Sequence, residues 1–154
     1  MVTVDSLKHV DILIGLTDEQ IARVAAICHT ETYSAQDIIV REREPSDEVY
    51  VIHKGSVEVI LSGGQVTAEA LAAAGPESII SMGQGQILGE MALIDSGPRS
   101  ATVRCTTDGS ELYVMRRADF VQLCEQDTDI GYKVMRNLAA DLAFKLRHRN
   151  LSWK

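Results

Sequence analysis

The chain has 154 residues, of which 45% are hydrophobic and 24% charged, so we expect one domain over 1–154 with a substantial core. Its formal net charge of −7 at pH 7 argues against nucleic-acid binding, which needs clustered lysines and arginines on the contact surface. No apolar run approaches the length of a membrane span, and the N-terminus lacks the basic and apolar pattern of a signal peptide.

The first predicted element is an amphipathic helix over 18–28. Thr17 and Gln20 have the spacing of a capping box, in which each side chain bonds the other residue's backbone N–H. The apolar residues that follow recur at helical spacing: Ile21, Val24, Ala25 and Cys28. We therefore expect one face of this helix to pack on the core.

Short β-strands follow the helix. Several apolar runs are separated by turn-forming Gly, Pro, Asp and Ser residues: 38–40, 49–52, 57–61, 78–82, 86–88, 101–105 and 112–115. Residues 62–77 are predicted to form a loop whose alanine-rich centre is a helical turn. The order of elements favours a mainly β fold with flanking helices, namely an antiparallel, jelly-roll-like β-roll of about eight strands over roughly 30–116.

Helical periodicity returns over roughly 117–150. Phe120, Leu123 and Cys124 indicate a short helix, and 127–129 can cap a longer one. The longer helix has an apolar stripe with further apolar residues beside it: Ile130, Val134, Leu138 and Leu142, then Met135, Ala139 and Leu146. We expect this stripe to pack against the β-roll.

The stretch LGEMALIDSGPRSATV, residues 88–103, brings together groups that suit an anion. Gly89 lets the backbone approach a ligand closely, and the helical turn expected after it leaves N–H groups free at its start. Arg99 presents a planar guanidinium that matches two phosphate oxygens. The backbone N–H groups of Ser100 and Ala101 can add donors, and their small side chains leave room for a ligand.

Glu90 is unusual beside a phosphate, because two negative charges repel each other. It fits if its carboxylate accepts hydrogen bonds from a neutral group such as a sugar hydroxyl. An acceptor beside an anion cradle indicates a phosphorylated sugar. Taken singly, Glu90 and Arg99 are each compatible with an ordinary solvated side chain, so the prediction rests on their spacing and on the β context around them.

These residues resemble a known family. The segments 89–93 and 98–103 are similar to the phosphate-binding cassette of cyclic nucleotide-binding domains, the modules of catabolite activator proteins, kinase regulatory subunits and cyclic-nucleotide-gated channels. The resemblance covers roughly 10–148 and includes segments that match the family's early strands: Gly15-Leu16-Thr17, Asp37-Ile38-Ile39, Ser46-Asp47, Tyr50-Val51-Ile52, Gly55 and Val57-Glu58-Val59. The 62–77 loop departs from the family pattern, since it is several residues longer than usual.

The resemblance implies a role for each site residue. Glu90 would bind the ribose 2′-hydroxyl and Arg99 the exocyclic phosphate oxygens. Five residues would line the phosphate and sugar: Gly89, Met91, Ala92, Ser100 and Ala101. Ser100 would favour cAMP as the ligand while leaving cGMP open. The C-terminal helix would act as a lid over the base through four contact residues: Lys145, Leu146, Arg149 and Trp153.

Nothing in the sequence resembles a catalytic centre, so we expect a protein that is not an enzyme. A cupin-type oxygenase needs a close His-x-His pair, and serine or cysteine nucleophiles need a visible base. The histidines are instead isolated along the chain: His9, His29, His53 and His148. We therefore expect no metal and no cofactor other than the nucleotide ligand.

Two further features bear on location and partners. Cys28, Cys105 and Cys124 are scattered without a CxxC pair, which is typical of buried thiols in a reducing compartment, so we expect a cytoplasmic protein. Residues 133–154 carry six basic residues against Asp141 as the one acid. Cations near a helix C-terminus suit the helix dipole, while contact with a membrane surface or nucleic acid is the alternative explanation.

The sequence therefore predicts a cyclic nucleotide sensor. Its C-terminal helix would reposition when the ligand binds and would signal to an attached effector, a protein partner or a second copy in a homodimer. Two alternatives remain open. One is a ligand-free scaffold that keeps the same fold, and the other is an enzyme that uses the nucleotide as its substrate.

Overall fold

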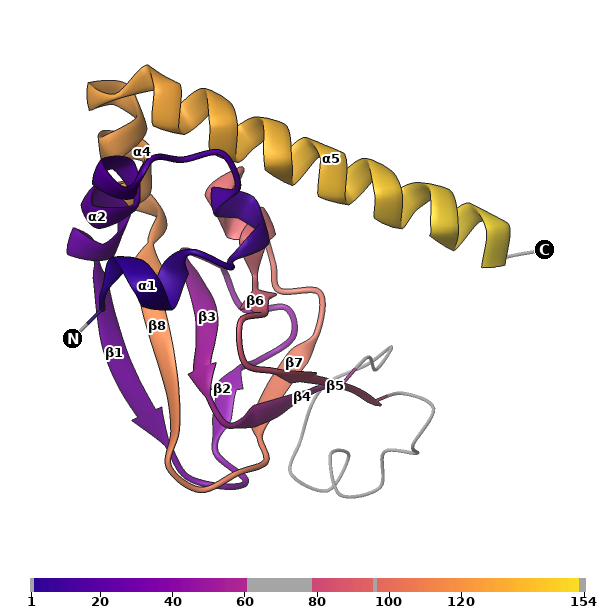
Figure 1. The fold of residues 1–154 in the computed structure, drawn as a ribbon. Helices are drawn as coiled ribbons and strands as arrows, with labels where there is room; N and C mark the ends of the chain where they lie inside the picture. The colour runs from indigo at the N-terminus through magenta and orange to yellow at the C-terminus, as the bar shows by residue number, and fades with distance from the viewer. Residues whose placement is uncertain (1, 61–78, 96, 153–154) are drawn as a thin grey trace.

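The computed structural model describes residues 2–60, 79–95 and 97–152, which form a rolled pair of sheets with helices at one end and along one side (Figure 1). The strands are β1 (Cys28–Tyr33), β2 (Ile38–Val40), β3 (Glu48–Lys54), β4 (Ser56–Ile60), β5 (Ile79–Gly83), β6 (Ile87–Leu88), β7 (Thr102–Cys105) and β8 (Ser110–Arg116). The helices are α1 (Val4–Leu7), η1 (Asp11–Leu13), α2 (Asp18–Ala26), η3 (Glu90–Leu93), α4 (Arg117–Gln126) and α5 (Thr128–Ser152). This element order confirms the predicted mainly β fold with flanking helices.

The strands pair antiparallel in two four-stranded sheets, with the orders β1-β8-β3-β6 and β2-β7-β4-β5. Side chains from both sheets meet inside the roll in one apolar cluster: Tyr50, Ile52, Val57, Leu88, Val103, Leu112 and Val114. Strand side chains alternate between the two faces of a sheet, so the residues between these point the other way. On β3 and β8 those are Val49, Tyr113 and Met115, which are also buried.

The second core lies between the helices and the outer face of β3 and β8. It joins the three strand residues Val49, Tyr113 and Met115 to apolar side chains of the helices, among them Leu13, Ile21, Val24, Phe120, Leu123, Ile130, Val134 and Leu138. Because both faces of β8 are covered, this strand is apolar along most of its length. The helices therefore pack directly against strands β3 and β8 of the roll.

The predicted helix 18–28 forms as α2 but ends at Ala26, two residues early. The capping box is present, since the Thr17 N–H donates to Gln20 Oε1 at 2.9 Å and the Gln20 N–H to Thr17 Oγ1 at 3.2 Å. Cys28 instead begins β1, a strand that the apolar runs did not predict. Its sequence CHTETY is largely polar, but every one of its residues pairs with β8, so backbone pairing determines its conformation.

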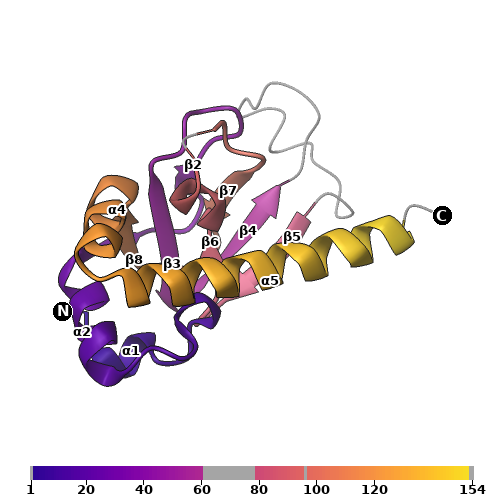
Figure 2. The ribbon, with the colours of Figure 1, turned by 90° about the horizontal axis from the view of Figure 1, so that it is seen from above.

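Helix α5 starts beside α4 and runs along the roll, and its C-terminal turns extend away from the strands (Figures 1 and 2). The predicted stripe is buried at Ile130, Val134 and Leu138, whereas Met135, Ala139 and Leu146 are exposed. Asn137 Nδ2 donates to the Ile12 and Ile14 carbonyl oxygens at 2.9 and 2.8 Å. The first part of α5 is thus anchored to η1, while its later turns lie outside the core.

Two further sequence-based predictions concern the 62–77 loop and membrane-spanning segments. The helical turn expected within 62–77 falls in a segment that lies outside the described residues. Among the helices that the structure describes, none is both long and apolar enough to cross a membrane.

Gly55, in the turn between β3 and β4, provides a test of the roll. Its φ is +90°, and a Cβ there would overlap the Ser110 side chain and lie 2.9 Å from Ser110 Cα. We predict that Gly55→Ala lowers the free energy of unfolding by about 2–5 kcal/mol, because backbone strain and overpacking add. Denaturant unfolding measures this loss.

The matched control is Gly109→Ala. Gly109 also has a positive φ of +73°, but a Cβ there would meet nothing within 4 Å. We expect this substitution to cost only the backbone strain, about 1–2 kcal/mol. Equal losses in the two variants would contradict the packing that we describe around Ser110.

Candidate functional site

The segment after β6 turns sharply at Gly89 and then forms the single helical turn η3. Gly89 has a φ of +71°, which favours glycine, and a Cβ at this position would collide with Arg99 Nη1. η3 buries Ala92 and Leu93 in the core and exposes Met91. Gly89 was expected to permit a close approach by a ligand, and here the group that approaches is the guanidinium of Arg99.

Arg99 is fixed by both its backbone and its side chain. Its N–H donates to the Glu44 carbonyl oxygen at 2.8 Å, and its own carbonyl accepts from the Arg43 N–H at 2.8 Å. Its Nη2 donates to the Glu48 carbonyl oxygen at 2.9 Å. This bond uses one of the five donors of a guanidinium, so the group is oriented while donors remain for an anion.

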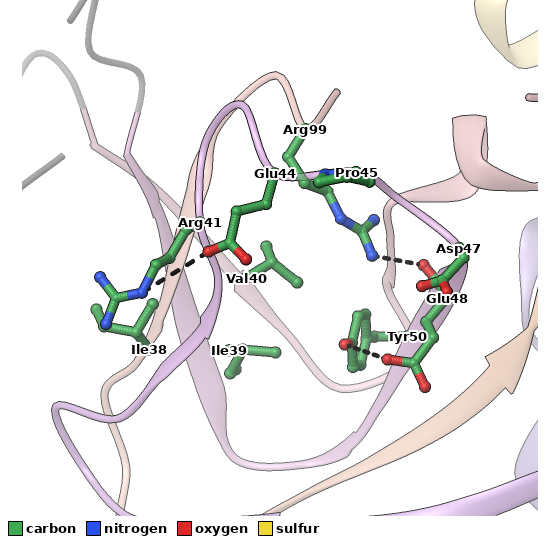
Figure 3. Close-up of a pocket in the computed structure, with 10 residues that line it drawn as sticks. All are labelled: Ile38, Ile39, Val40, Arg41, Glu44, Pro45, Asp47, Glu48, Tyr50 and Arg99. Atoms are coloured by element: carbon green, nitrogen blue, oxygen red, sulfur yellow. Dashed lines mark hydrogen bonds and ion pairs between the residues drawn. The ribbon is translucent and has the colours of Figure 1, made fainter. Parts of the chain in front are cut away.

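Tyr50 supports the guanidinium from strand β3. Arg99 Cζ lies 5.8 Å from the centroid of the Tyr50 ring, within the range of a cation–π contact. The Tyr50 hydroxyl donates to Glu48 Oε1 at 3.1 Å, which holds the ring in place (Figure 3). No spacing rule links a strand tyrosine to an arginine far along the chain, so the sequence does not indicate this role.

Glu90 carries the other charge of the site. Its side chain is 15% exposed, and its Oε2 lies 3.9 Å from Nζ of Lys145 on α5. Burial raises the pKa of the Glu90 carboxyl, and the nearby charge of Lys145 offsets part of this rise. Lys145 Nζ also lies 2.9 Å from Asp141 Oδ2 on the same helix. The carboxylate is thus a poorly hydrated acceptor.

Two adjoining cavities share these residues. One has a volume of about 180 Å³ and opens toward the roll interior, where it is lined by Val40, Tyr50, Val59, Met82, Ile87, Leu88, Gly89, Glu90, Arg99, Ser100, Ala101, Val103 and Lys145. The other, of about 260 Å³, is lined by Ser46, Gly89, Glu90, Met91, Ala92, Asp95, Gly97, Pro98, Arg99 and Ser100. A mostly apolar cavity with one carboxylate, Glu90, and two cations, Arg99 and Lys145, suits a ligand that carries an anion and neutral polar groups.

Arg99 also lines a third cavity. It has a volume of about 270 Å³ and is shown in Figure 3 with its lining residues, which include Arg41, Glu44, Asp47 and Glu48. Arg41 Nε and Glu44 Oε1 are 3.8 Å apart there. Arg99 therefore lines an acidic hollow as well as the two cavities beside Glu90.

The structure brings most of the predicted site residues together and leaves others apart. Gly89, Glu90, Met91, Ala92, Arg99, Ser100 and Ala101 all line one or both of the two adjoining cavities, and so does Lys145. Leu146 is 59% exposed and lines neither of them. The side chain of Arg149 and all of Trp153 lie outside the described parts of the chain.

Comparison with known proteins gives a family match. The family model described as the cyclic nucleotide-binding domain matches residues 30–127. A cGMP-dependent protein kinase, isozyme 1, from Drosophila melanogaster is 26% identical over 145 residues, which are 93% of this chain and 18% of that protein. The chain spans between 13% and 24% of the length of five kinases and kinase regulatory subunits that it matches.

Solved structures are similar along nearly the whole chain. The catabolite activator protein of Thermus thermophilus is 26% identical with a TM-score of 0.74, and the match covers 93% of this chain and 61% of that one. The regulatory domain of Toxoplasma gondii PKA, crystallised with cAMP, is 26% identical with a TM-score of 0.71, and the match covers 92% and 48% of the two chains.

Burial of the Glu90 charge leads to a stability prediction. A carboxyl whose pKa is raised by folding destabilises the folded state at pH values above that pKa, where the buried group is ionised. We predict that Glu90→Gln raises the melting temperature of the ligand-free protein at neutral pH. The gain should shrink as the pH falls through the raised pKa, because Glu90 then becomes protonated and neutral. Calorimetric melting across a pH series measures this.

Glu125→Gln serves as the control, since Glu125 is exposed on α4. We expect it to leave the melting temperature nearly unchanged at every pH. A melting temperature that falls in Glu90→Gln at neutral pH, or a gain that does not depend on pH, would contradict the cost that we assign to the Glu90 charge.

Proposed function

The chain belongs to the cyclic nucleotide-binding domain family, and from that premise we propose that 1–154 forms one regulatory domain that binds a cyclic nucleotide between Glu90 and Arg99. The observation that carries the proposal is the shared lining of one cavity by a buried acceptor, an oriented guanidinium and small residues. That combination matches a ligand with a cyclic phosphate, a ribose hydroxyl and an apolar base.

Arg99 would hold the phosphate. Its guanidinium is already oriented by the bond to the Glu48 carbonyl and by the Tyr50 ring, so little side-chain entropy is lost when it binds. Two of its remaining N–H groups can donate to two phosphate oxygens in a bidentate contact. Gly89 and Ser100 line the cavity with little side-chain bulk, which leaves room for the anion.

Glu90 would accept a hydrogen bond from the ribose 2′-hydroxyl. A neutral donor satisfies the buried carboxylate without bringing a second negative charge near the phosphate. Glu90 and Arg99 line the same cavity, which is consistent with one ligand that contacts both. We therefore propose that Glu90 recognises the sugar and Arg99 the anion.

We propose cAMP as the preferred ligand and cGMP as the second. Ser100 lines both cavities with a small side chain and a hydroxyl. A related structure of 26% identity was crystallised with cAMP, whereas the Drosophila relative is a cGMP-dependent kinase, so the family resemblance alone allows either nucleotide. The nucleotide would be a regulatory ligand that the protein binds without converting it.

Ligand binding would be communicated through α5. Lys145 lines the cavity from this helix, and several apolar side chains of the same helix are exposed, among them Tyr132, Met135, Phe144 and Leu146. A ligand that binds more tightly to one position of the helix shifts the population toward that position by the difference in binding free energy. The exposed face of α5 would then contact a protein partner or a second copy of the chain.

Calorimetric titration with cAMP and cGMP tests the proposal. We expect cAMP to bind with a dissociation constant of about 1 μM or lower, equivalent to about −8 kcal/mol. Arg99→Ala should weaken binding by about 2–4 kcal/mol, because a charge-assisted bidentate contact is lost. The affinity of Arg99→Lys should lie between those of the unchanged protein and Arg99→Ala, since lysine keeps the charge but lacks the planar guanidinium that makes a bidentate contact.

Arg23→Ala is the matched control. Arg23 lies on α2, where it pairs with Asp127 at 2.9 Å, and it should leave nucleotide binding unchanged. If neither nucleotide binds the unchanged protein, the proposal is wrong and the ligand-free scaffold is favoured. If cAMP is recovered as AMP after the titration, the enzyme alternative is favoured instead.

A further inference from the structure

Lys145 stands between two carboxylates that belong to different elements. Its Nζ lies 2.9 Å from Oδ2 of Asp141, one helical turn earlier on α5, and 3.9 Å from Oε2 of Glu90 on η3. The three side chains differ in exposure, at 56% for Lys145, 34% for Asp141 and 15% for Glu90. The pair with Asp141 lies within one helix, whereas the pair with Glu90 connects the helix to the cavity.

The Lys145–Glu90 contact compensates a charge that burial disfavours. Because Glu90 is the least exposed of the three groups, it gains the most from a nearby cation. Burial alone would lower the pKa of Lys145, but the hydrogen bond to Asp141 and the charges of Glu90 and Asp141 raise it overall. Lys145 therefore remains charged when it faces Glu90.

We propose that Lys145 pairs with Glu90 in the ligand-free protein and must release it when the ligand's 2′-hydroxyl binds. The proposal rests on the function proposed above and specifies which residue the ligand displaces. Lys145 then acts as an internal competitor for the acceptor, so it sets how much the 2′-hydroxyl adds to affinity. It is a residue that determines specificity for ribose over deoxyribose.

The position of Lys145 on α5 makes this release possible without disrupting the fold. The helix is held at Asn137 by two hydrogen bonds to the carbonyl oxygens of Ile12 and Ile14. Lys145 lies two turns beyond that anchor, where the neighbouring side chains Phe144 and Leu146 are exposed. Release of Glu90 frees this outer part of the helix while the anchored part stays packed.

A cavity beside the contact gives the released side chain room. It has a volume of about 430 Å³ and is lined by Glu90, Asp141 and Lys145 together with polar residues of other segments: His9, Asp11 of η1, and Gln84 and Gln86 of the β5–β6 turn. Lys145 can therefore leave Glu90 while it keeps its bond to Asp141. The exchange replaces an ion pair at Glu90 by a hydrogen bond from a neutral hydroxyl to the carboxylate.

Two lysines of α5 provide a matched test. Lys133 and Lys145 each pair with the carboxylate four residues earlier, at 3.0 Å to Asp129 and 2.9 Å to Asp141, but Lys133 does not line the cavity. Lys145→Gln and Lys133→Gln are titrated with cAMP and with 2′-deoxy-cAMP, which lacks the competing hydroxyl. We expect Lys145→Gln to tighten cAMP binding about 2- to 5-fold, as a half-exposed ion pair allows, and to leave 2′-deoxy-cAMP unchanged. Lys133→Gln should change neither affinity.

The opposite results overturn the proposal. If Lys145→Gln weakens cAMP binding, Lys145 contacts the ligand rather than competing with it. If it changes the affinities for both ligands equally, the effect does not pass through the 2′-hydroxyl. If cAMP does not bind the unchanged protein, the proposed function fails, and with it the competition for Glu90.

A measurement without ligand distinguishes failure of the proposed function from failure of the Lys145–Glu90 pairing. Melting temperatures of the unchanged protein, Glu90→Gln, Lys145→Gln and the double variant form a double-mutant cycle. We expect Glu90→Gln to stabilise the protein more when Lys145 has been replaced, because the buried carboxylate then has no compensating cation from α5. Additive effects would overturn the Lys145–Glu90 pairing even if the nucleotide binds.

Discussion

The site depends on the close approach of the Arg99 guanidinium to the backbone at Gly89. A side chain at Gly89 would collide with that guanidinium, so glycine is needed there for its lack of bulk as well as for its positive φ. The approach lets Arg99 reach the Glu48 carbonyl, which joins strand β3 to the segment between β6 and β7. One side chain thereby holds the segment that we propose to bind the ligand against the roll and orients its own charge.

The two charges of the site are compensated in different ways. Arg99 is tied to a carbonyl oxygen and an aromatic ring, neither of which neutralises its positive charge. Glu90 is buried and depends on Lys145 from α5. A ligand that brings an anion to Arg99 and a neutral donor to Glu90 would neutralise the Arg99 charge and supply the Glu90 carboxylate with a hydrogen bond. This complementarity explains why a stable fold would retain a buried carboxylate that lowers its own stability.

The sequence predicted what local patterns determine and missed what chain pairing determines. The capping box of α2, the apolar runs and the segment 88–103 each have a local signal, and each is found as an element or a turn. β1 has a polar sequence and forms because β8 pairs with it, so its own residues do not predict a strand. The support of Arg99 by Tyr50 and the pairing of Lys145 with Glu90 arise from tertiary packing, which has no spacing rule. The predictions for 62–77 and Trp153 stay predictions.

A crystal structure of the protein with cAMP tests the central claim most directly. The account predicts that the Arg99 guanidinium lies within about 3 Å of two exocyclic phosphate oxygens and that Glu90 accepts a hydrogen bond from the 2′-hydroxyl. It also predicts that Lys145 has moved away from Glu90. Electron density for the nucleotide elsewhere on the roll, with Arg99 still bonded only to Glu48 and Glu90 still paired with Lys145, would contradict it.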